Sequence, residues 1–431
     1  MRVLVLGAYG LIGISVVQRL LESGYEVTGL GRSVAMARLK FPQVSWLSYD
    51  ISHLTTPESW VPLIEGCHAV VNCAGALQDG ARDDLRSLQS VAMRALFTAC
   101  EGAGTASVVQ ISATGAELNP RTVFMRTKAE ADLALKQSSL RWTILRPGLV
   151  IGPTAYGATA LLRALAGCPV VLPVLGGRQP IQTVHVADVA DAVLQVVAGC
   201  VPSRQVYDLV EDQPHSLLQV LITFRAWLGL RSGYVIGVPD WIGVTIMRIG
   251  DLLGHLGWRT PLRTTTLIEL NAGIIGNSAS WKNVGGKPAA SLAETLSRLP
   301  STLQERWFAR LWLLKPMILG VLALFWCASG IIALVRFDAS AAVLLDRGVA
   351  LGPAYAVVSG GALLDLALGL AILYRASAFA AAIGMVVATT SYLVGGTFVA
   401  PDLWVDPLGT FVKTLPALML ALVAAAIIEE R

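Results

Sequence analysis

The residues with the clearest chemistry in this chain are three glycines near its start. The sequence GAYGLIG places Gly7, Gly10 and Gly13 directly after the largely apolar residues 1–6 and before a stretch with helical spacing of apolar residues. In this setting the first glycine permits a tight turn, the second lets a phosphate approach the backbone, and the third lets the helix pack on the strand. Free N–H groups and the positive end of the helix then hold an anion. The motif therefore predicts a binding site for the pyrophosphate of a dinucleotide.

The residues between these glycines belong to the same predicted site. Tyr9, Leu11 and Ile12 lie in the turn and at the start of the helix, and we assign them to cofactor binding together with the glycines.

The residues after the second predicted strand, 26–30, indicate which dinucleotide is bound. NAD enzymes usually carry an acid there to bind the ribose hydroxyls. This chain has Gly31, Arg32 and Ser33 instead. Because an arginine can pair with a 2′-phosphate and stack on the adenine, we expect NADP(H) rather than NAD(H).

The elements that must position these residues alternate along the first part of the chain. Apolar strand patterns at 26–30, 44–47, 69–74, 107–112 and 142–145 are separated by helical patterns. This alternation predicts an α/β fold with a doubly wound parallel sheet.

The composition excludes several classes of function. The chain has 431 residues, a formal net charge of +4 and 14% charged residues, and no Lys/Arg-rich run suggests nucleic-acid binding. Its six cysteines are scattered without a C-x-x-C pair, which is typical of a reducing compartment. We find no Cys/His cluster or paired carboxylate with metal-ligand spacing, so no metal site is predicted.

The last part of the chain has a different composition. Residues 316–335, 348–373, 376–400 and 408–428 are almost free of charge, and each reaches the roughly 20 residues that a helix needs to cross a bilayer. Asp365 is the one acid deep in a predicted span, and such an acid is costly in lipid and usually faces a partner, a cavity or a substrate. These segments predict an all-α transmembrane bundle of four helices over residues 316–431.

A juxtamembrane linker, residues 301–315, is expected before the first span. Arg306, Arg310 and Lys315 gather there, a pattern that suits a cytoplasmic segment near anionic lipid. The N-terminus is no signal peptide, because its apolar stretch runs straight into the glycine turn. We therefore expect a multi-pass protein of a bacterial-type inner (plasma) membrane, with the N-terminal domain and the C-terminus in the cytoplasm.

Several motifs together resemble the extended, atypical short-chain dehydrogenase/reductases, an epimerase-like family with an NAD(P)-binding Rossmann fold. The resemblance covers about residues 1–300 and rests on the glycine turn, Asp50-Ile51, the NCAG stretch that begins at Asn72, the SAT stretch that begins at Ser112, Lys128, the LRPG segment that ends at Gly148 and the HVADVA segment that begins at His185. It implies a small substrate lobe, mainly about residues 150–180 and 205–300. Residues 310–431 resemble a DoxX-like four-helix membrane domain, a group linked to quinone or thiol redox chemistry.

The resemblance also implies further cofactor contacts. Asp50 and Ile51 would flank the adenine. The stretch of Cys73, Ala74 and Gly75 would pass beneath the adenine ribose and phosphates, and Pro147, Gly148 and Val150 would lie near the nicotinamide.

The chain departs from this family at the position that moves the proton. Family reductases carry Tyr-x-x-x-Lys, whereas this chain reads FMRTK, with Phe124 in place of the tyrosine. Lys128 can still bind the nicotinamide ribose, and Ser112 can still polarise a carbonyl, so both are candidate catalytic residues. Two interpretations stay open: another donor such as Thr114, Tyr156 or water replaces the tyrosine, or the site binds nucleotide without turning it over.

The sequence therefore leaves two functions. One is a membrane-anchored NADP(H)-binding oxidoreductase acting on a lipophilic, quinone- or isoprenoid-like carbonyl. The other is a non-catalytic NADP(H)-binding sensor, or an assembly or structural subunit with a membrane protein partner. Residues 238–258, apolar but interrupted by charges, form either an amphipathic helix on the lipid bilayer or a wall of the substrate lobe.

Overall fold

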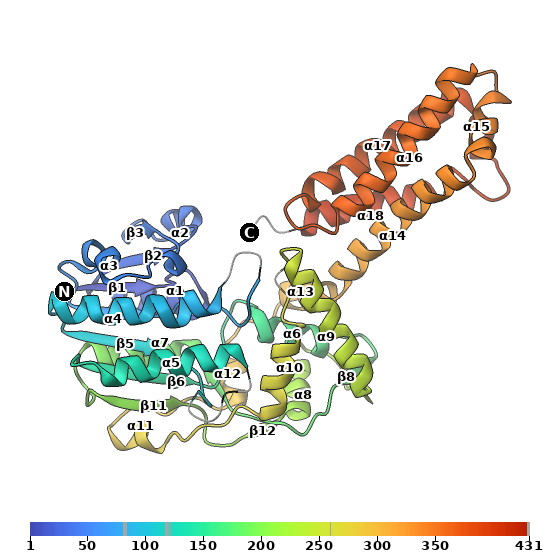
Figure 1. Cartoon of the computed structure of the whole chain (residues 1–431). Helices are drawn as coiled ribbons and strands as arrows, with labels where there is room; N and C mark the ends of the chain where they lie inside the picture. Colours follow the sequence, from blue (N-terminus) through green and yellow to red (C-terminus); the bar gives the residue numbers. More distant parts are fainter. Residues whose placement is uncertain (81–83, 117–119, 121, 259, 429–431) are drawn as a thin grey trace. The chain divides into compact units, whose positions relative to one another are not determined.

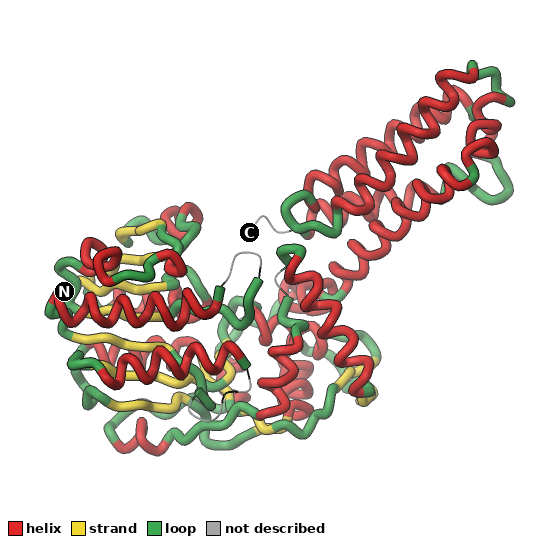
Figure 2. Tube along the Cα trace, viewed as in Figure 1, coloured by secondary structure: helices red, strands yellow, loops and turns green. Residues whose placement is uncertain are grey.

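In a computed structural model the chain forms two compact units. The first comprises Met1–Asp251 and Thr260–Ala309, and the second comprises Leu252–Arg259 and Arg310–Arg431. The structure describes residues 1–80, 84–116, 120, 122–258 and 260–428. Strands and helices alternate in the first unit, whereas the second is built of helices (Figure 2).

The first unit is organised around one parallel sheet of seven strands. Its strand order is β11-β6-β5-β4-β1-β2-β3, and every adjacent pair is parallel. The strands are β1 (Arg2–Leu6), β2 (Glu26–Gly31), β3 (Ser45–Ser48), β4 (Ala69–Asn72), β5 (Ser107–Ile111), β6 (Trp142–Pro147) and β11 (Gln205–Leu209). The doubly wound parallel sheet predicted from the sequence is confirmed.

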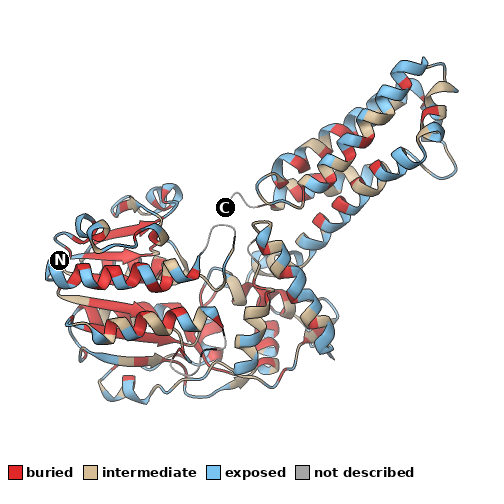
Figure 3. Cartoon of the chain, viewed as in Figure 1, coloured by how far each residue is buried: buried red, intermediate tan, exposed pale blue. Residues whose placement is uncertain are grey.

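Helices cover both faces of this sheet (Figure 1). In β1, Val3 and Val5 join a core with α1 (Leu11–Glu22) and α7 (Val186–Val197). Leu4 and Leu6 join a second core with α3 (Pro57–Ile64), α4 (Ala92–Ala103) and α5 (Val123–Gln137). Because successive side chains of a strand point to opposite faces, a strand buried on both faces must be apolar at every position. This explains why the central strands read as continuous apolar runs, buried along their length (Figure 3).

The crossover from β3 to β4 creates the position of the site. The chain runs outward from β1 through β2 to β3 and then returns to place β4 on the other side of β1. In parallel α/β sheets, ligands bind at the carboxyl ends of the strands where the winding reverses. Gly7 follows β1 and Cys73 follows β4, so both predicted cofactor segments lie at this reversal.

A smaller lobe is formed by short paired strands and helices. The pairs are β7 (Leu149–Ile151) with β10 (Thr183–His185), β8 (Val171–Val174) with β13 (Tyr234–Gly237), and β9 (Pro180–Ile181) with β12 (His215–Ser216). Its core includes side chains of α6 (Gly157–Ala166), α8 (Leu217–Trp227) and α12 (Leu292–Ser297). The remaining elements of this part of the chain are α2 (Ala35–Lys40), η1 (Ile51–His53), η2 (Ser87–Val91), α9 (Asp240–His255), α10 (Thr264–Ala272), α11 (Ala279–Asn283) and α13 (Leu303–Trp312).

One segment expected in the lobe belongs to the main sheet. Residues 205–209 lie within the range 205–300 predicted for the lobe, but they form β11 and pair with β6. Tyr207 and Leu209 are buried there, whereas Gln205 is exposed. A strand of five residues with only two fully buried side chains gives a weak pattern, and its partner decides its place.

The second unit is a helical bundle. Its helices are α14 (Leu314–Val335), α15 (Phe337–Leu345), α16 (Leu351–Ala371), α17 (Ala378–Val399) and α18 (Thr414–Ile427), with a short helix η3 (Pro401–Trp404). Among the described residues, α14, α16 and α17 are long and apolar enough to cross a membrane. The fourth predicted span, 408–428, contains α18 with 14 residues, fewer than the roughly 20 that cross a bilayer core. Four spans therefore remain a prediction.

Small residues hold the spans together. A Cβ built on Gly330 of α14 would lie 2.6 Å from the Ala362 carbonyl oxygen of α16, and one on Gly369 would lie 2.9 Å from the Cys327 backbone nitrogen. Most of the apolar surface of each long helix faces outward. Close backbone packing inside and apolar side chains outside are typical of helices in lipid.

The packing of Gly13 gives a testable prediction for the glycine turn. A Cβ on Gly13 would lie 2.2 Å from the Gly7 carbonyl oxygen, a backbone atom that cannot move away cheaply. Gly13→Ala should therefore lower the free energy of unfolding by about 1–3 kcal/mol, measured by thermal unfolding of the purified full chain.

The matched control is Gly102→Ala in α4, where a Cβ meets nothing within 4 Å. It should leave stability unchanged or raise it by up to about 1 kcal/mol. Equal unfolding temperatures for the two variants would contradict the packing described here.

Candidate functional site

The glycine turn brings three parts of the chain within backbone contact. Gly7 adopts a φ of 65°, in the left-handed region that favours glycine, and a Cβ there would lie 2.9 Å from the Ala74 Cα. Gly10 is the N-cap of α1, and its N–H donates to the Gly7 carbonyl oxygen at 2.9 Å. The start of α1 therefore packs directly against the ends of β1 and β4.

The start of α1 has the properties of an anion site. Gly10 offers no side chain to cap the helix, and the first turn, with Leu11, Ile12 and Gly13, contains no acid. The first N–H groups of a helix have no partner within the helix, and the helix dipole makes this end positive. The donors at this turn therefore fit a pyrophosphate group.

Tyr9 lies over the end of β2. Its hydroxyl accepts a hydrogen bond from the Ser33 N–H at 3.3 Å, and its ring stands against Gly31, where a Cβ would lie 2.3 Å from the ring. The Tyr9 side chain is part-exposed. This contact links the glycine turn to Gly31 and Ser33, the two neighbours of Arg32.

Arg32 lies beside Asp50 at the same edge of the sheet. The Arg32 Nη1 is 3.8 Å from the Asp50 Oδ2, and both side chains remain about one third exposed, at 35% and 29%. Burial acts to raise the pKa of Asp50, but hydrogen bonds from the Ser52 hydroxyl (2.7 Å) and N–H (3.0 Å), together with Arg32, hold it below its usual range. Ile51 is buried directly after Asp50. The structure thus brings Arg32, Asp50 and Ile51 together, with the guanidinium still open to solvent.

The loop after β4 is fixed by Asn72. The Asn72 carboxamide accepts from the Ala74 N–H at 2.9 Å and donates to the Gln110 side chain at 2.9 Å. The Cys73 N–H donates to the Leu6 carbonyl oxygen at 3.0 Å. Burial raises the pKa of the Cys73 thiol to about 12, although Lys128 acts to lower it. Cys73 is therefore a neutral packing residue rather than a nucleophile.

The Lys128 side chain contacts this loop at Gly75. Its Nζ donates to the Ile111 carbonyl oxygen at 2.9 Å, and a Cβ on Gly75 would lie 3.3 Å from the same Nζ. Burial lowers the pKa of Lys128, while Asp132 acts to raise it. The glycine turn, the loop of Cys73, Ala74 and Gly75, and Lys128 thus lie together at the carboxyl ends of β1, β4 and β5.

The Ser112 hydroxyl is hydrogen-bonded to a buried ion pair. Its hydroxyl donates to the Asp132 Oδ2 at 2.8 Å, and the same oxygen accepts from the Arg146 Nη2 at 2.9 Å. All three side chains are nearly inaccessible to solvent. Burial raises the pKa of Asp132, although the hydrogen bonds from Arg146 and Ser112 act to lower it. Ser112 therefore offers a ligand its lone pairs, and it could polarise a carbonyl only if its proton turned away from Asp132.

Sequence reasoning missed Asp132 and Arg146. Asp132 lies one helical turn after Lys128 in α5, and the LRPG segment contains Arg146. An acid and a base 14 positions apart give no signal by themselves, because their contact depends on α5 packing against the end of β6.

The position of the missing tyrosine is occupied by Phe124, which is half-buried. Of the alternative donors, Thr114 is buried and its N–H donates to the Pro147 carbonyl oxygen at 3.4 Å, whereas Tyr156 is 54% exposed at the start of α6. Thr114 thus lies with the predicted nicotinamide segment.

That nicotinamide segment is tightly packed. The Gly148 N–H donates to the Leu209 carbonyl oxygen at 3.1 Å, and a Cβ on Gly148 would lie 2.5 Å from the Gln182 carbonyl oxygen. Pro147 ends β6, and Val150 is half-buried in β7. The close approach explains the need for glycine between these two strands.

The lobe reaches the site through α9 and α10. Asp251 of α9 accepts from the Gln78 side chain at 3.0 Å and from the Thr264 hydroxyl at 2.7 Å. Glu269 of α10 accepts from Thr122, the N-cap of the helix that carries Lys128. The Gln78–Asp251 and Thr122–Glu269 contacts join residues more than 140 positions apart, and no local pattern could have revealed them.

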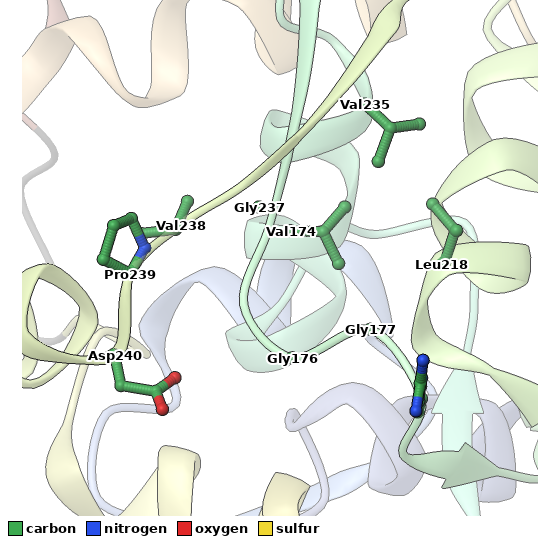
Figure 4. Close-up of a pocket in the computed structure, with 10 residues that line it drawn as sticks. Val174, Gly176, Gly177, Leu218, Val235, Gly237, Val238, Pro239 and Asp240 are labelled. Carbon is green, nitrogen blue, oxygen red and sulfur yellow. The ribbon is translucent and has the colours of Figure 1, made fainter.

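An open cavity of about 530 Å³ lies in the lobe (Figure 4). It is lined by the ends of β8 and β13, the start of α9 and Leu218 of α8, with Arg178 and Asp240 as its charged residues. Its other walls are mostly apolar or glycine. None of the predicted cofactor residues lines it, so this cavity is separate from the predicted dinucleotide site.

The HVADVA segment, which begins at His185, makes contacts within the chain. Asp188 accepts from the Ala290 N–H at 2.9 Å and pairs with Arg298 at 3.3 Å. The His185 Nδ1 accepts from the Ala187 N–H and caps α7. These bonds tie the end of the lobe to the sheet.

In the second unit, Asp365 connects three helices. Its carboxylate accepts from the Ser329 hydroxyl of α14 at 2.7 Å and from the Tyr392 hydroxyl of α17 at 3.0 Å. Asp365 is buried. A polar group in lipid must find partners within the protein, and these two hydroxyls supply them.

Two models of known protein families match the chain, one in each unit. Residues 7–199 match a family model described as NAD(P)H-binding, and residues 323–422 match one described as a DoxX-like family. No curated protein matches the chain.

Three similar solved structures illustrate the fold of the first part. They are the UDP-glucose 4-epimerase of Thermotoga maritima with UDP-glucose (17% identity, TM-score 0.52, 69% of this chain and 96% of that one), the UDP-glucose 4-epimerase of Thermus thermophilus with NAD (21%, 0.53, 69% and 98%), and an NADPH-dependent quinone oxidoreductase of Escherichia coli with NADPH (19%, 0.53, 69% and 99%).

The burial of Cys73 gives a prediction for thiol reactivity. Because its raised pKa keeps the Cys73 thiol protonated up to about pH 9 and beyond, iodoacetamide at pH 8 should modify the exposed Cys200 first. Mass spectrometry of the alkylated peptides measures both rates. Cys73 should react only after denaturation; comparable rates for the two thiols in the folded chain would contradict the described environment of Cys73.

Proposed function

We propose that this chain, which joins an N-terminal NAD(P)H-binding domain of epimerase-like fold to a C-terminal DoxX-like membrane domain, is a membrane-anchored NADP(H)-dependent oxidoreductase. Its substrate is a lipophilic carbonyl compound, a quinone or an isoprenoid-like carbonyl. The observation that carries the proposal is the position of Lys128, whose Nζ contacts both Gly75 and the end of β5, beside the loop that packs on the glycine turn. A lysine at this position can bind the nicotinamide ribose of a dinucleotide whose pyrophosphate lies at the glycine turn.

The bound cofactor supplies a hydride, and the protein supplies position and charge. The N–H groups at the start of α1 hold the pyrophosphate, Arg32 holds the 2′-phosphate, and Lys128 holds the nicotinamide ribose. The segment of Pro147, Gly148 and Val150 forms the wall beside the nicotinamide.

Phe124 favours a quinone over a simple ketone. Hydride transfer to a ketone leaves an alkoxide, a strong base that needs a proton donor in the transition state. Hydride transfer to a quinone leaves a hydroquinone anion, whose charge spreads over an aromatic ring and which water can protonate afterwards. A site without the tyrosine is thus suited to quinone reduction. The quinone oxidoreductase among the similar structures has the same fold.

A second candidate function has its own support. Phe124 removes the usual proton donor, and the Ser112 hydroxyl is already engaged with Asp132. A nucleotide-binding subunit that senses NADP(H), or that stabilises a membrane assembly through a protein partner, needs neither group. Such a subunit would bind NADP(H) with the same cofactor residues.

For the location we propose a bacterial-type inner membrane crossed several times, with the first unit and the C-terminus in the cytoplasm. The basic residues Arg306, Arg310 and Lys315 at the start of the membrane unit support this orientation.

The test of the proposed reaction is NADPH oxidation by the purified full chain in lipid, with short-chain quinones and lipophilic ketones compared. Quinone-dependent oxidation is expected. Lys128→Met should lower kcat/KM by about 100-fold or more, because ribose and nicotinamide lose their anchor. Lys136→Met on the same helix is the control and should retain activity. Tight NADPH binding with no turnover of any acceptor would select the non-catalytic function instead.

The choice of NADP(H) is tested at Arg32. Loss of a charge-assisted contact of about 1.5–3 kcal/mol should weaken NADPH binding by about 10- to 150-fold in Arg32→Ala and leave NADH binding nearly unchanged. Isothermal calorimetry measures both affinities. Lys40→Ala, which removes an exposed positive charge from neighbouring α2, is the matched control. Equal losses for NADPH and NADH at Arg32 would overturn the assignment.

A further inference from the structure

Helix α9 buries mostly small residues and exposes large apolar ones, which is the opposite of a surface helix in water. The side turned to the protein is made mostly of small residues, namely Gly243, Met247, Gly250 and Gly254. The packing is close, since a Cβ on Gly243 would lie 2.7 Å from the Leu175 side chain. Several large apolar residues of α9 are left exposed, and much of the helix is coloured as exposed in Figure 3.

The outward side of α9 is strongly apolar. It exposes Trp241 (71%), Leu252 (63%), Ile249 (54%) and Ile246 (42%), which we call the α9 face. Strand β13, which ends three residues before α9, exposes Tyr234, Val235 and Ile236 as well. An amphipathic helix in water buries its large apolar residues and exposes polar ones, so the α9 face requires an apolar partner.

The end of α9 indicates what that partner is. Residues 252–259 belong to the second unit, where the Trp258 Nε1 donates to the Leu373 carbonyl oxygen at 2.7 Å and the Arg375 N–H donates to the Leu256 carbonyl oxygen at 3.0 Å. The Arg375 guanidinium lies 5.5 Å from the Trp258 ring centroid. Leu373 and Arg375 form the turn between α16 and α17, two of the candidate spans. The residues directly after α9 are thus fixed at the end of the membrane bundle, where spans leave the bilayer.

We propose that the α9 face lies in the bilayer surface, at the boundary between headgroups and acyl chains. Tryptophan and large aliphatic residues suit this depth, and the exposed Arg248 and His255 of the same helix can reach lipid phosphates. The occupant of the face is lipid rather than a soluble protein, because the chain itself fixes the end of α9 at a membrane boundary. The inference does not depend on the proposed reaction, since a non-catalytic subunit would dock in the same way.

The docked face has a consequence for the cavity of Figure 4. Val235 and Gly237 of β13, Asp240 of α9, and Val238 and Pro239, which connect the two elements, line that cavity. An α9 face in the bilayer surface therefore brings this apolar-walled cavity next to lipid.

The test is site-directed spin labelling of the full chain in nanodiscs of phosphatidylcholine and phosphatidylglycerol. Ile249→Cys carries the nitroxide. The exposed Cys200 is replaced by serine in all variants, and the chain with only this replacement gives the baseline. Leu133→Cys on α5 is the matched control, because Leu133 is also 54% exposed but lies on a helix of the dinucleotide-binding sheet. Leu252→Cys repeats the measurement at a second position of the α9 face.

The readout is the collision rate of the nitroxide with oxygen, which concentrates in lipid, against that with a water-soluble nickel complex. We expect the oxygen-to-nickel ratio at positions 249 and 252 to exceed the ratio at 133 several-fold. Ratios equal to that at 133 would show a face in water and overturn the proposal. Low collision rates with both reagents would show a face covered by protein, and this result would overturn it as well.

Discussion

The close backbone contact between β1, α1 and the loop after β4 is the constraint on which the rest of the first unit depends. Gly7 meets Ala74, and Gly13 meets Gly7, at distances that leave no room for a side chain. This contact places the start of α1 at the point where the winding of the sheet reverses. The start of α1, the predicted cofactor residues Arg32 and Asp50, and the Cys73 loop all take their positions from it.

The buried charges near the glycine turn explain why a site without the tyrosine keeps the remaining polar residues. Asp132, Arg146 and Ser112 form one network, and Lys128 lies close enough to Asp132 to act on its pKa. Removing one partner of a buried ion pair costs about 3–5 kcal/mol, because the other charge stays buried. Ser112 and Lys128 therefore have a structural role beside any catalytic one, and their presence alone does not require a reaction.

The two units arrange their apolar residues in different ways. In the first, alternate residues of each central strand enter one of two cores, and helices cover both faces of the sheet. In the second, glycine and alanine bring helices together while large apolar residues face outward, and Asp365 is satisfied by Ser329 and Tyr392. Helix α9 follows the second rule although most of it belongs to the first unit, which is the reason for assigning its outer face to lipid.

The sequence by itself determined the sheet, the glycine turn and the apolar helices, because these follow from local periodicity and from residues a few positions apart. It could not determine that 205–209 completes the sheet, that α18 is shorter than a span, or that Ser112 donates to Asp132. Nor could it choose between lipid surface and lobe wall for residues 238–258. The pairing of β11, the Ser112 hydrogen bond and the surroundings of α9 depend on contacts between distant residues, such as Gln78 with Asp251 or Trp258 with Leu373, which only the packing of the folded chain creates.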